Sequence, residues 1–271
     1  MTFLTTAPPL IAALILLGGG TFLAMLGAFL VRSRVALDTL RSNNEVAGFK
    51  FATLGMLYGV LLAFAVLVVW GELNDAQNNV AAEAGAAATM FRLADGMATE
   101  GAQDGVGDAG APLRAALAVY LRSAIHEDWP AMERGGESVG TGASLDGVYA
   151  ALLAVRVADP RDAVLLAEAL RQADVLTQAR RARIVVADGV VPGVVWFVLL
   201  LGAFVTIAFT FFFGTASLRA QVLMTGALAL LIFSCLMIIV AIDRPFAGMV
   251  KLDPRPLTAL LEDFGVDATR P

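Results

Sequence analysis

The chain has 271 residues, of which 58% are hydrophobic and 16% are charged, and its mean hydropathy is +0.76. Soluble domains are about 45–50% apolar and about 25% charged, so this composition argues against a soluble enzyme, and its hydrophobicity argues against a disordered chain. The formal net charge of −5 argues against a nucleic-acid partner, because binding to phosphates needs clustered Lys and Arg.

Four apolar segments are long enough to cross a bilayer as helices. A hydrocarbon core of about 30 Å needs about 20 apolar residues, and such segments occupy residues 10–31, 51–70, 190–214 and 220–242. The first is too long for the core of a cleavable signal peptide and has no basic residue before it, so we expect it to be retained. None of the four contains Asp, Glu, Lys, Arg or His, which argues against a proton-coupled transporter.

The long segment between the second and third spans is rich in alanine, which favours helices over a sheet. We expect the second span to continue as a stalk to about Ala98. Proline and serine signals at helix starts then divide the segment into three further helices. The first begins at Pro112 and ends at Trp129-Pro130. The second begins with a Ser144 cap and ends near Arg156, and the third begins at Asp159-Pro160 and ends near Ala187.

The sequence therefore predicts an all-α integral membrane protein with four transmembrane helices and a helical extramembrane outgrowth between the second and third. We divide it into a first transmembrane pair (1–72), the extramembrane domain (73–188), a second transmembrane pair (189–243) and a C-terminal tail (244–271) with a short helix at 257–264.

The charges of the loops predict an orientation in the bacterial inner membrane. The short loops at 32–50 and 214–219 carry five basic and two acidic residues, whereas residues 71–189 carry seventeen acids and ten arginines. The positive-inside rule therefore places the short loops in the cytoplasm and the middle domain outside. Arg180, Arg181, Arg183 and Arg244 lie close to the spans on the opposite side and weigh against this assignment.

The sequence shows no set of catalytic residues. Cys235, the only cysteine, lies in an apolar run far from His126, the only histidine. An intrachain disulfide, a His/Cys zinc site and a Cys–His nucleophile pair are therefore excluded, and no phosphate-binding loop is present. We expect a protein that is not an enzyme and that uses neither a cofactor nor a metal.

Small residues recur every fourth position in the second span, at Gly55, Gly59 and Ala63. Such a stripe lets another helix approach closely in lipid. One interpretation is helix packing within the subunit, and the other is a stripe that faces a partner copy or a pore.

Several polar strings around the spans resemble one bacterial membrane family. They are NEVAGFKF (44–51), LYGVLLAF (57–64), WGELNDA (70–76), Glu83-Ala84, RRAR (180–183), Pro192, Trp196, TFFFG (210–214) and DRPFAG (243–248). This set resembles the bestrophin-like family of unknown function. The resemblance implies a distant relation to bestrophins, which are pentameric anion channels with four spans per subunit, and hence a homo-oligomer in the bilayer that conducts inorganic ions.

Charged and polar motif residues cluster at the ends of the spans. At one end Glu45 is placed for a salt bridge with Arg41. At the other end we expect a similar depth for Glu72, Asn74, Asp75, Asp188, Asp243 and Arg244. Glu83 and Arg183 are further candidates for the polar network at this end. One interpretation is an interfacial network in which Arg183 and Arg244 pair with Glu72, Asp75 or Asp188. The other is an ion vestibule, in which acidic rings would favour cations.

Two functions from different classes follow from these features. The first is an oligomeric channel in which Tyr58 and Phe64 form a constriction that dewets, with Gly55 and Gly59 beside it. The second is a non-conducting membrane scaffold whose helical outgrowth binds another protein.

Overall fold

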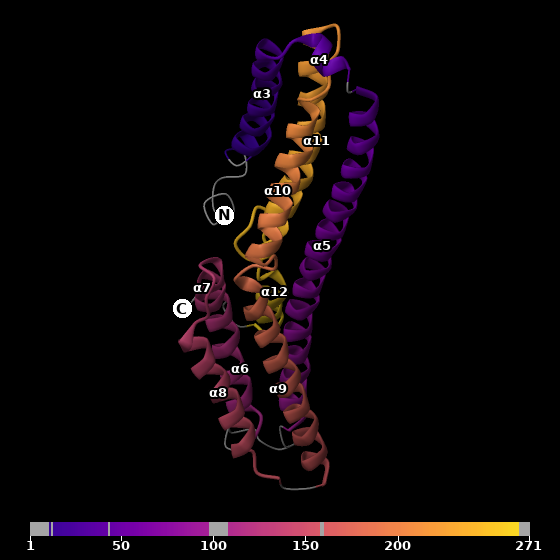
Figure 1. The fold of residues 1–271 in the computed structure, drawn as a ribbon. Coiled ribbons are helices and arrows are strands. Elements are labelled where there is room, and N and C mark those ends of the chain that lie inside the picture. The colour runs from indigo at the N-terminus through magenta and orange to yellow at the C-terminus, as the bar shows by residue number, and fades with distance from the viewer. Residues whose placement is uncertain (1–10, 12, 43, 98–107, 158–159, 266–271) are drawn as a thin grey trace. The chain divides into compact units, whose positions relative to one another are not determined.

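A computed structural model describes residues 11, 13–42, 44–97, 108–157 and 160–265, and the regular elements in that part of the chain are all helices (Figure 1). In chain order they are η1 (Leu14–Gly19, a π-helical turn), α3 (Gly20–Arg34), α4 (Leu37–Arg41), α5 (Asn44–Gly96), α6 (Ala111–Ser123), η2 (Ala124–Asp128), α7 (Trp129–Glu133), α8 (Val139–Ala154), α9 (Pro160–Ala187), α10 (Gly193–Thr210), α11 (Leu218–Ile242) and α12 (Arg255–Asp263).

The four predicted spans are confirmed as helices that are long and apolar enough to cross a membrane. They are Leu14–Arg34, Asn44–Gly96, Gly193–Thr210 and Leu218–Ile242. The predicted start of the first span at residue 10 lies outside the described residues. The second span continues without a break to Gly96, because no proline interrupts the alanine-rich sequence that follows Trp70. Ala98, the predicted end of the stalk, is outside the described residues.

Two predicted boundaries in the middle segment are wrong. Pro130 does not end the helical path but stands in the first turn of α7, where the missing N–H of proline is tolerated. Ser144 does not cap α8. Ser138 does, and its side chain accepts a hydrogen bond from the Thr141 amide, while Ser144 lies inside the helix and donates to the Gly140 carbonyl. Asp159, the predicted cap of α9, lies outside the described residues.

The chain forms two compact units. Unit 1 comprises residues 1–72, 189–244 and 248–250, and unit 2 comprises residues 73–188, 245–247 and 251–271. Helix α5 contributes its N-terminal part to unit 1 and its C-terminal part to unit 2.

Glycines allow the helices of unit 1 to approach closely. A Cβ atom on Gly20 of α3 would lie 2.6 Å from the Phe233 ring of α11, and one on Gly202 of α10 would lie 2.5 Å from the Tyr58 ring. In both pairs an aromatic ring fills the space that a side chain would need, as expected for helix packing in lipid, where small residues admit close contact.

Side chains of two motifs fix the ends of the helices in unit 1. The Asn44 amide donates to the Gly214 carbonyl at 2.9 Å and accepts from the Gly214 N–H at 3.0 Å, so it holds the turn after α10. At the opposite end, the Asp243 carboxylate accepts from the Val191 N–H at 2.8 Å, and the Asp243 carbonyl accepts from the Val190 N–H. These bonds satisfy backbone groups that the helix ends leave free.

Unit 2 has an ordinary hydrophobic core. Alanines of α5 and α9 allow those helices to contribute without bulk, and larger residues of α6, α8 and α12 fill the space between them. Fully buried members are Ala87, Met90, Leu113, Leu117, Leu152, Ala169, Ala173, Leu176, Leu257 and Leu261.

Candidate functional site

The most densely charged site in the described residues is a buried ionic cluster in unit 2, which we define as Glu83, Asp128, Arg180 and Arg183. Glu83 and Arg183 have no exposed surface. The Arg183 guanidinium donates to both Glu83 oxygens, from Nε at 2.8 Å and from Nη2 at 3.0 Å. This is a bidentate pair, which fixes both orientation and distance, and it joins α5 to α9.

A second bidentate pair completes the ionic cluster. Arg180 Nε and Nη2 donate to Asp128 at 2.8 and 3.1 Å, and Arg183 Nη2 also lies 3.3 Å from an Asp128 oxygen. Asp128 in addition accepts from the Ser138 N–H at 2.9 Å. Because Ser138 caps α8, the carboxylate of Asp128 connects the start of α8 to the arginines of α9.

Neighbouring side chains saturate the remaining bonding capacity of the ionic cluster. Tyr120 donates its hydroxyl to Glu83 at 2.6 Å. The Arg183 Nη1 lies 3.3 Å from the Met132 sulfur, and its guanidinium carbon lies 4.6 Å from the centre of the Trp129 ring, a cation–π contact. Within the described residues no fully buried polar side-chain atom of the ionic cluster is left without a partner.

Burial and neighbouring charges shift the pKa values of Tyr120 and Arg183. Burial raises the pKa of Tyr120 well above 10, and the adjacent Glu83 raises it further. Burial alone would lower the pKa of Arg183, but Glu83, Tyr120 and Asp128 outweigh it, and the pKa is raised. Two carboxylates and two guanidiniums balance one another. The ionic cluster is therefore a positioning device for α5, α8 and α9, and its acids are occupied by arginine.

The structure corrects the predicted partners of Arg183. It pairs with Glu83 and Asp128 rather than with Glu72, Asp75 or Asp188. Glu72 is half-buried, and Asn74, Asp75 and Asp188 are exposed. Arg244 is half-buried and takes part in no ion pair within unit 1 as far as the structure describes it, and no ion pair joins Glu45 to Arg41 there. Asp243 is buried and holds backbone N–H groups instead of an arginine.

The four residues proposed for a pore separate into two kinds. Tyr58 is buried in unit 1, where its hydroxyl donates to the Leu199 carbonyl at 2.9 Å. It therefore serves helix packing and is not free to form a constriction. Phe64 is 63% exposed, and Gly55 and Gly59 have no atom of another helix near the position of a Cβ. These three remain available to face lipid or another copy.

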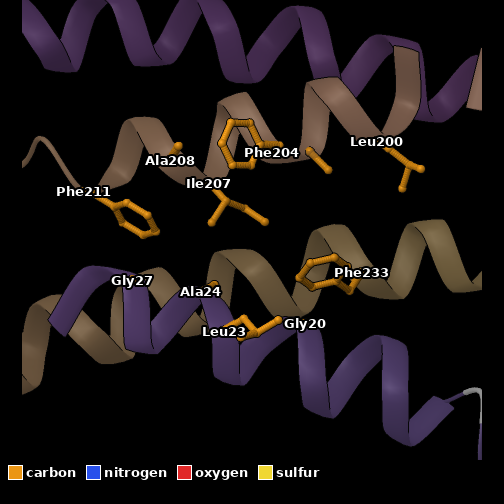
Figure 2. Close-up of a pocket in the computed structure, with 11 residues that line it drawn as sticks. Gly20, Leu23, Ala24, Gly27, Leu200, Phe204, Ile207, Ala208, Phe211 and Phe233 are labelled. Atoms are coloured by element: carbon orange, nitrogen blue, oxygen red, sulfur yellow. The ribbon is translucent and has the colours of Figure 1, made fainter. Parts of the chain in front are cut away.

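Unit 1 also contains an apolar cavity of about 360 Å³ between α3, α10 and α11 (Figure 2). Figure 2 shows Leu200 and Ile207 of α10, and Phe211 just after it, directed toward the side of the cavity that α3 and Phe233 form. The lining consists of glycine, alanine and large apolar residues. Such a lining offers no group that would bind an ion.

Sequence reasoning missed Asp128 and Tyr120 as members of the polar site. Tyr120 is an aromatic residue of α6 that is buried together with Leu113 and Leu117, but its hydroxyl reaches Glu83 across 37 positions of sequence. The one usable signal for Asp128 was the acidic pair Glu127-Asp128 beside an aromatic residue within a helical segment. Among the described residues no group of His, Cys, Asp and Glu could hold a metal ion.

A comparison with family models identifies the family, and solved structures share the fold. A family model described as a bestrophin-like domain matches residues 19–257. A crystal structure of a bacterial bestrophin homologue from Klebsiella pneumoniae, carrying one mutation, superposes with a TM-score of 0.68 at 14% identity and covers 92% of this chain and 99% of that chain. A second variant of a bestrophin homologue from this organism gives a TM-score of 0.64 at 15% identity, covering 91% and 97%.

A further crystal structure, of a membrane protein with one substitution, gives a TM-score of 0.63 at 16% identity and covers 90% of this chain and 98% of that chain. At these identities the likeness concerns the fold. No curated protein matches the sequence.

Proposed function

Because the chain belongs to the bestrophin-like family, we propose that it assembles into a homo-oligomeric ion channel in the bacterial inner membrane and has no enzymatic activity. By the pattern of bestrophins the oligomer is a pentamer. Helix α5 lines the conduction path, and the segment 73–188 forms an extramembrane helical domain.

The observation that carries this proposal is the exposed face of α5. Val60, Phe64 and Leu67 follow one another at spacings of four and three, which places them on one face of a helix, and all three are exposed. Seven residues beyond Leu67, Asn74 is also exposed, followed by the exposed Asp75. Asn74 and Asp75 lie just beyond the end of the span at residue 70, where a pore needs polar residues at its mouth.

The constriction in this proposal is formed by Phe64. A ring of phenylalanines from several copies would narrow the path with apolar surface and gate it by dewetting. Gly55 and Gly59 lie beside this face with open space around them, so they let neighbouring copies of α5 approach. Tyr58 does not face the path in this proposal, but its hydrogen bond to Leu199 holds α5 against α10.

The charges at the two ends of the path differ. Glu72 and Asp75 would form acidic rings at one end, which favour cations, whereas the loop at 32–50 carries Arg32, Arg34, Arg41 and Lys50 at the other. Measurement of ion flux with different salts therefore determines which ion the channel selects.

Reconstitution of the purified protein into liposomes tests the function. We expect ion flux, with a selectivity measurable by exchanging the salt across the membrane, and a ring of subunits on a sizing column with light scattering. An absence of flux at every applied potential, together with a monomer or dimer, would contradict the channel and favour the scaffold.

The side of the membrane on which residues 73–188 lie remains a prediction from the loop charges, which place them outside. Gly147 is exposed and has open space around it, so Gly147→Cys in a Cys235→Ser background is a suitable reporter. Labelling of intact cells by an impermeant thiol reagent is expected; labelling only after lysis would place the domain in the cytoplasm.

A further inference from the structure

A second cavity in unit 1 differs from the apolar one in its chemistry. It has a volume of about 380 Å³, within the range of small-molecule sites, and it is lined by residues of α5, α10, α11 and the turn between α10 and α11. Its apolar wall includes Phe51 and Phe213, whose rings meet edge to face at 5.5 Å. We call it the threonine cavity, because Thr210, Thr215 and Thr225 contribute to its lining.

The threonine cavity lies at the ends of the spans. Thr210 is the last residue of α10, and Gln221 is the fourth residue of α11. Thr215 belongs to the turn that joins them, and Phe51 is the first residue of the second predicted span. A ligand there would have its polar part near the membrane surface and its apolar part along the spans.

The hydroxyl protons of the three threonines are already in use. Thr210 donates to the Ile207 carbonyl at 2.6 Å, and Thr215 donates to the Ser217 carbonyl at 2.9 Å. Because a hydroxyl has one proton, Thr225 must be the donor in its 3.3 Å contact with Thr210. What the threonines still offer is lone pairs, so they can accept hydrogen bonds.

Gln221 adds an acceptor that lacks a donor. The side chain is 3% exposed, and its Nε2 donates to the Phe213 carbonyl at 2.7 Å, which settles which end of the amide is the oxygen. Its Oε1 is buried and has no hydrogen-bond partner among the described residues. A buried unpaired acceptor is costly, and the last torsion of glutamine is soft, so a small turn lets Oε1 meet a donor in the cavity.

We propose that the threonine cavity binds the hydroxyl-bearing head of a neutral long-chain amphiphile, such as a long-chain alcohol or an acylglycerol. The hydroxyl donates to Gln221 Oε1, the acceptor without a partner, and the hydrocarbon chain lies against the Phe51 ring and the apolar residues of α11 that line the cavity. The proposal does not rest on whether the protein conducts.

The lining selects against charged heads. Among the described residues that line it there is no Lys or Arg to neutralise a carboxylate or phosphate, and its acceptors would repel an anion. The same described lining has no Asp or Glu to offset the desolvation of an ammonium group. A neutral donor is therefore the head group that matches the polar atoms present.

Photolabelling of the full-length protein in nanodiscs tests this site. Three probes share one diazirine-bearing alkyl chain and end in a hydroxyl, a carboxylate or an ammonium group. We expect the alcohol to label the peptide that holds Met224 and Leu228, which line the cavity, about three- to tenfold more than the other two, as one hydrogen bond allows.

Two variants and one control sharpen the test. Gln221→Met removes the acceptor and should lower labelling by the alcohol to the level of the charged probes. Gly48→Leu fills the cavity, because Gly48 lines it and has its nearest neighbour at 4.0 Å, and should abolish labelling by all three. Thr206→Val removes a buried hydroxyl of α10 that does not line the cavity, and should change nothing.

Equal labelling by the three probes, an unchanged signal in Gln221→Met, or a signal that persists in Gly48→Leu would overturn the proposal. The melting temperature of each variant, measured in the same nanodiscs, shows whether it is folded. A Gln221→Met protein that fails to fold leaves the decision to the comparison of probes on the wild type and to Gly48→Leu.

Discussion

Every ion pair among the described residues lies in unit 2, and unit 1 has none. In unit 1, polar side chains bond to backbone partners instead, as Tyr58 does to Leu199 and Asn44 does to Gly214. Unit 2 buries four charged side chains and pairs them with one another. One chain thus uses two ways of fixing helices. Close contact at glycines suits a membrane, where burying a charge is expensive, and an ionic cluster suits a domain whose surface is polar.

The largest expected effect is on the ionic cluster of unit 2. Arg183→Met leaves Glu83 without its bidentate partner and should lower the free energy of unfolding by about 3–5 kcal/mol, the typical cost of breaking one side of a buried pair. Thermal unfolding followed by circular dichroism measures it. Arg171→Met, which breaks the exposed pair with Glu168, is the control and should leave the melting temperature close to that of the wild type.

Combining Arg183→Met with Glu83→Gln should restore part of the stability, because the unpaired buried charge is removed as well. If the single variant melts like the Arg171→Met control, the ionic cluster does not hold unit 2 together.

The matching disruption in unit 1 is steric. Gly202→Ala places a methyl group 2.5 Å from the Tyr58 ring, whose hydroxyl is held by Leu199, so it should destabilise unit 1 by about 1–3 kcal/mol through overpacking. Gly193→Ala on the same helix has open space around it and should be neutral. Equal melting temperatures for the two variants would mean that close contact at Gly202 is not what fixes α10.

The stability of unit 2 should depend on pH in the alkaline range through Tyr120. Burial and the neighbouring Glu83 raise the pKa of Tyr120 in the folded state, so the unfolded chain loses that proton first as the pH rises. The stabilisation is complete below about pH 10, the ordinary pKa of tyrosine, and declines above it. Melting temperatures from pH 9 to 11.5 should fall more steeply for the wild type than for Tyr120→Phe; parallel curves would remove Tyr120 as the cause.

The smallest effect is expected at the surface of unit 2. Hydrogen bonds from Arg171 and Gln172 lower the pKa of Glu168 to about 2. Its contribution is therefore present above pH 4.5 and is lost as the pH falls through about 2. Because the pair is exposed, Glu168→Gln should barely change the melting temperature at pH 7 and should slightly flatten its decline in acid. A large loss at pH 7 would show that surface pairs also carry unit 2.

The sequence was sufficient to predict the membrane-spanning helices but not to predict which residues form ion pairs. Uncharged runs of about 20 residues define membrane helices by length alone, and alanine without proline explains why α5 continues past Trp70. The partner of Arg183 depends on where a residue 100 positions away comes to lie, and local patterns do not encode that distance. Ser138 and Ser144 are equivalent caps by residue type, and only the structure of the preceding turn decides between them.

The pore candidates show the same division. Tyr58 and Phe64 are both aromatic residues of one span, and composition treats them alike. Tyr58 is buried because Gly202 has no side chain and leaves the space that the ring occupies. Phe64 meets no such opening and stays 63% exposed.

The most direct test of the account is modification of single cysteines during ion flux. In a Cys235→Ser background, Phe64→Cys and Phe22→Cys replace rings of similar exposure, 63% and 65%, on α5 and α3. A charged thiol reagent added to channels in liposomes should change the flux through Phe64→Cys severalfold and leave Phe22→Cys unchanged. Flux that is insensitive at Phe64→Cys, or equally sensitive at both positions, would contradict a conduction path lined by the exposed face of α5.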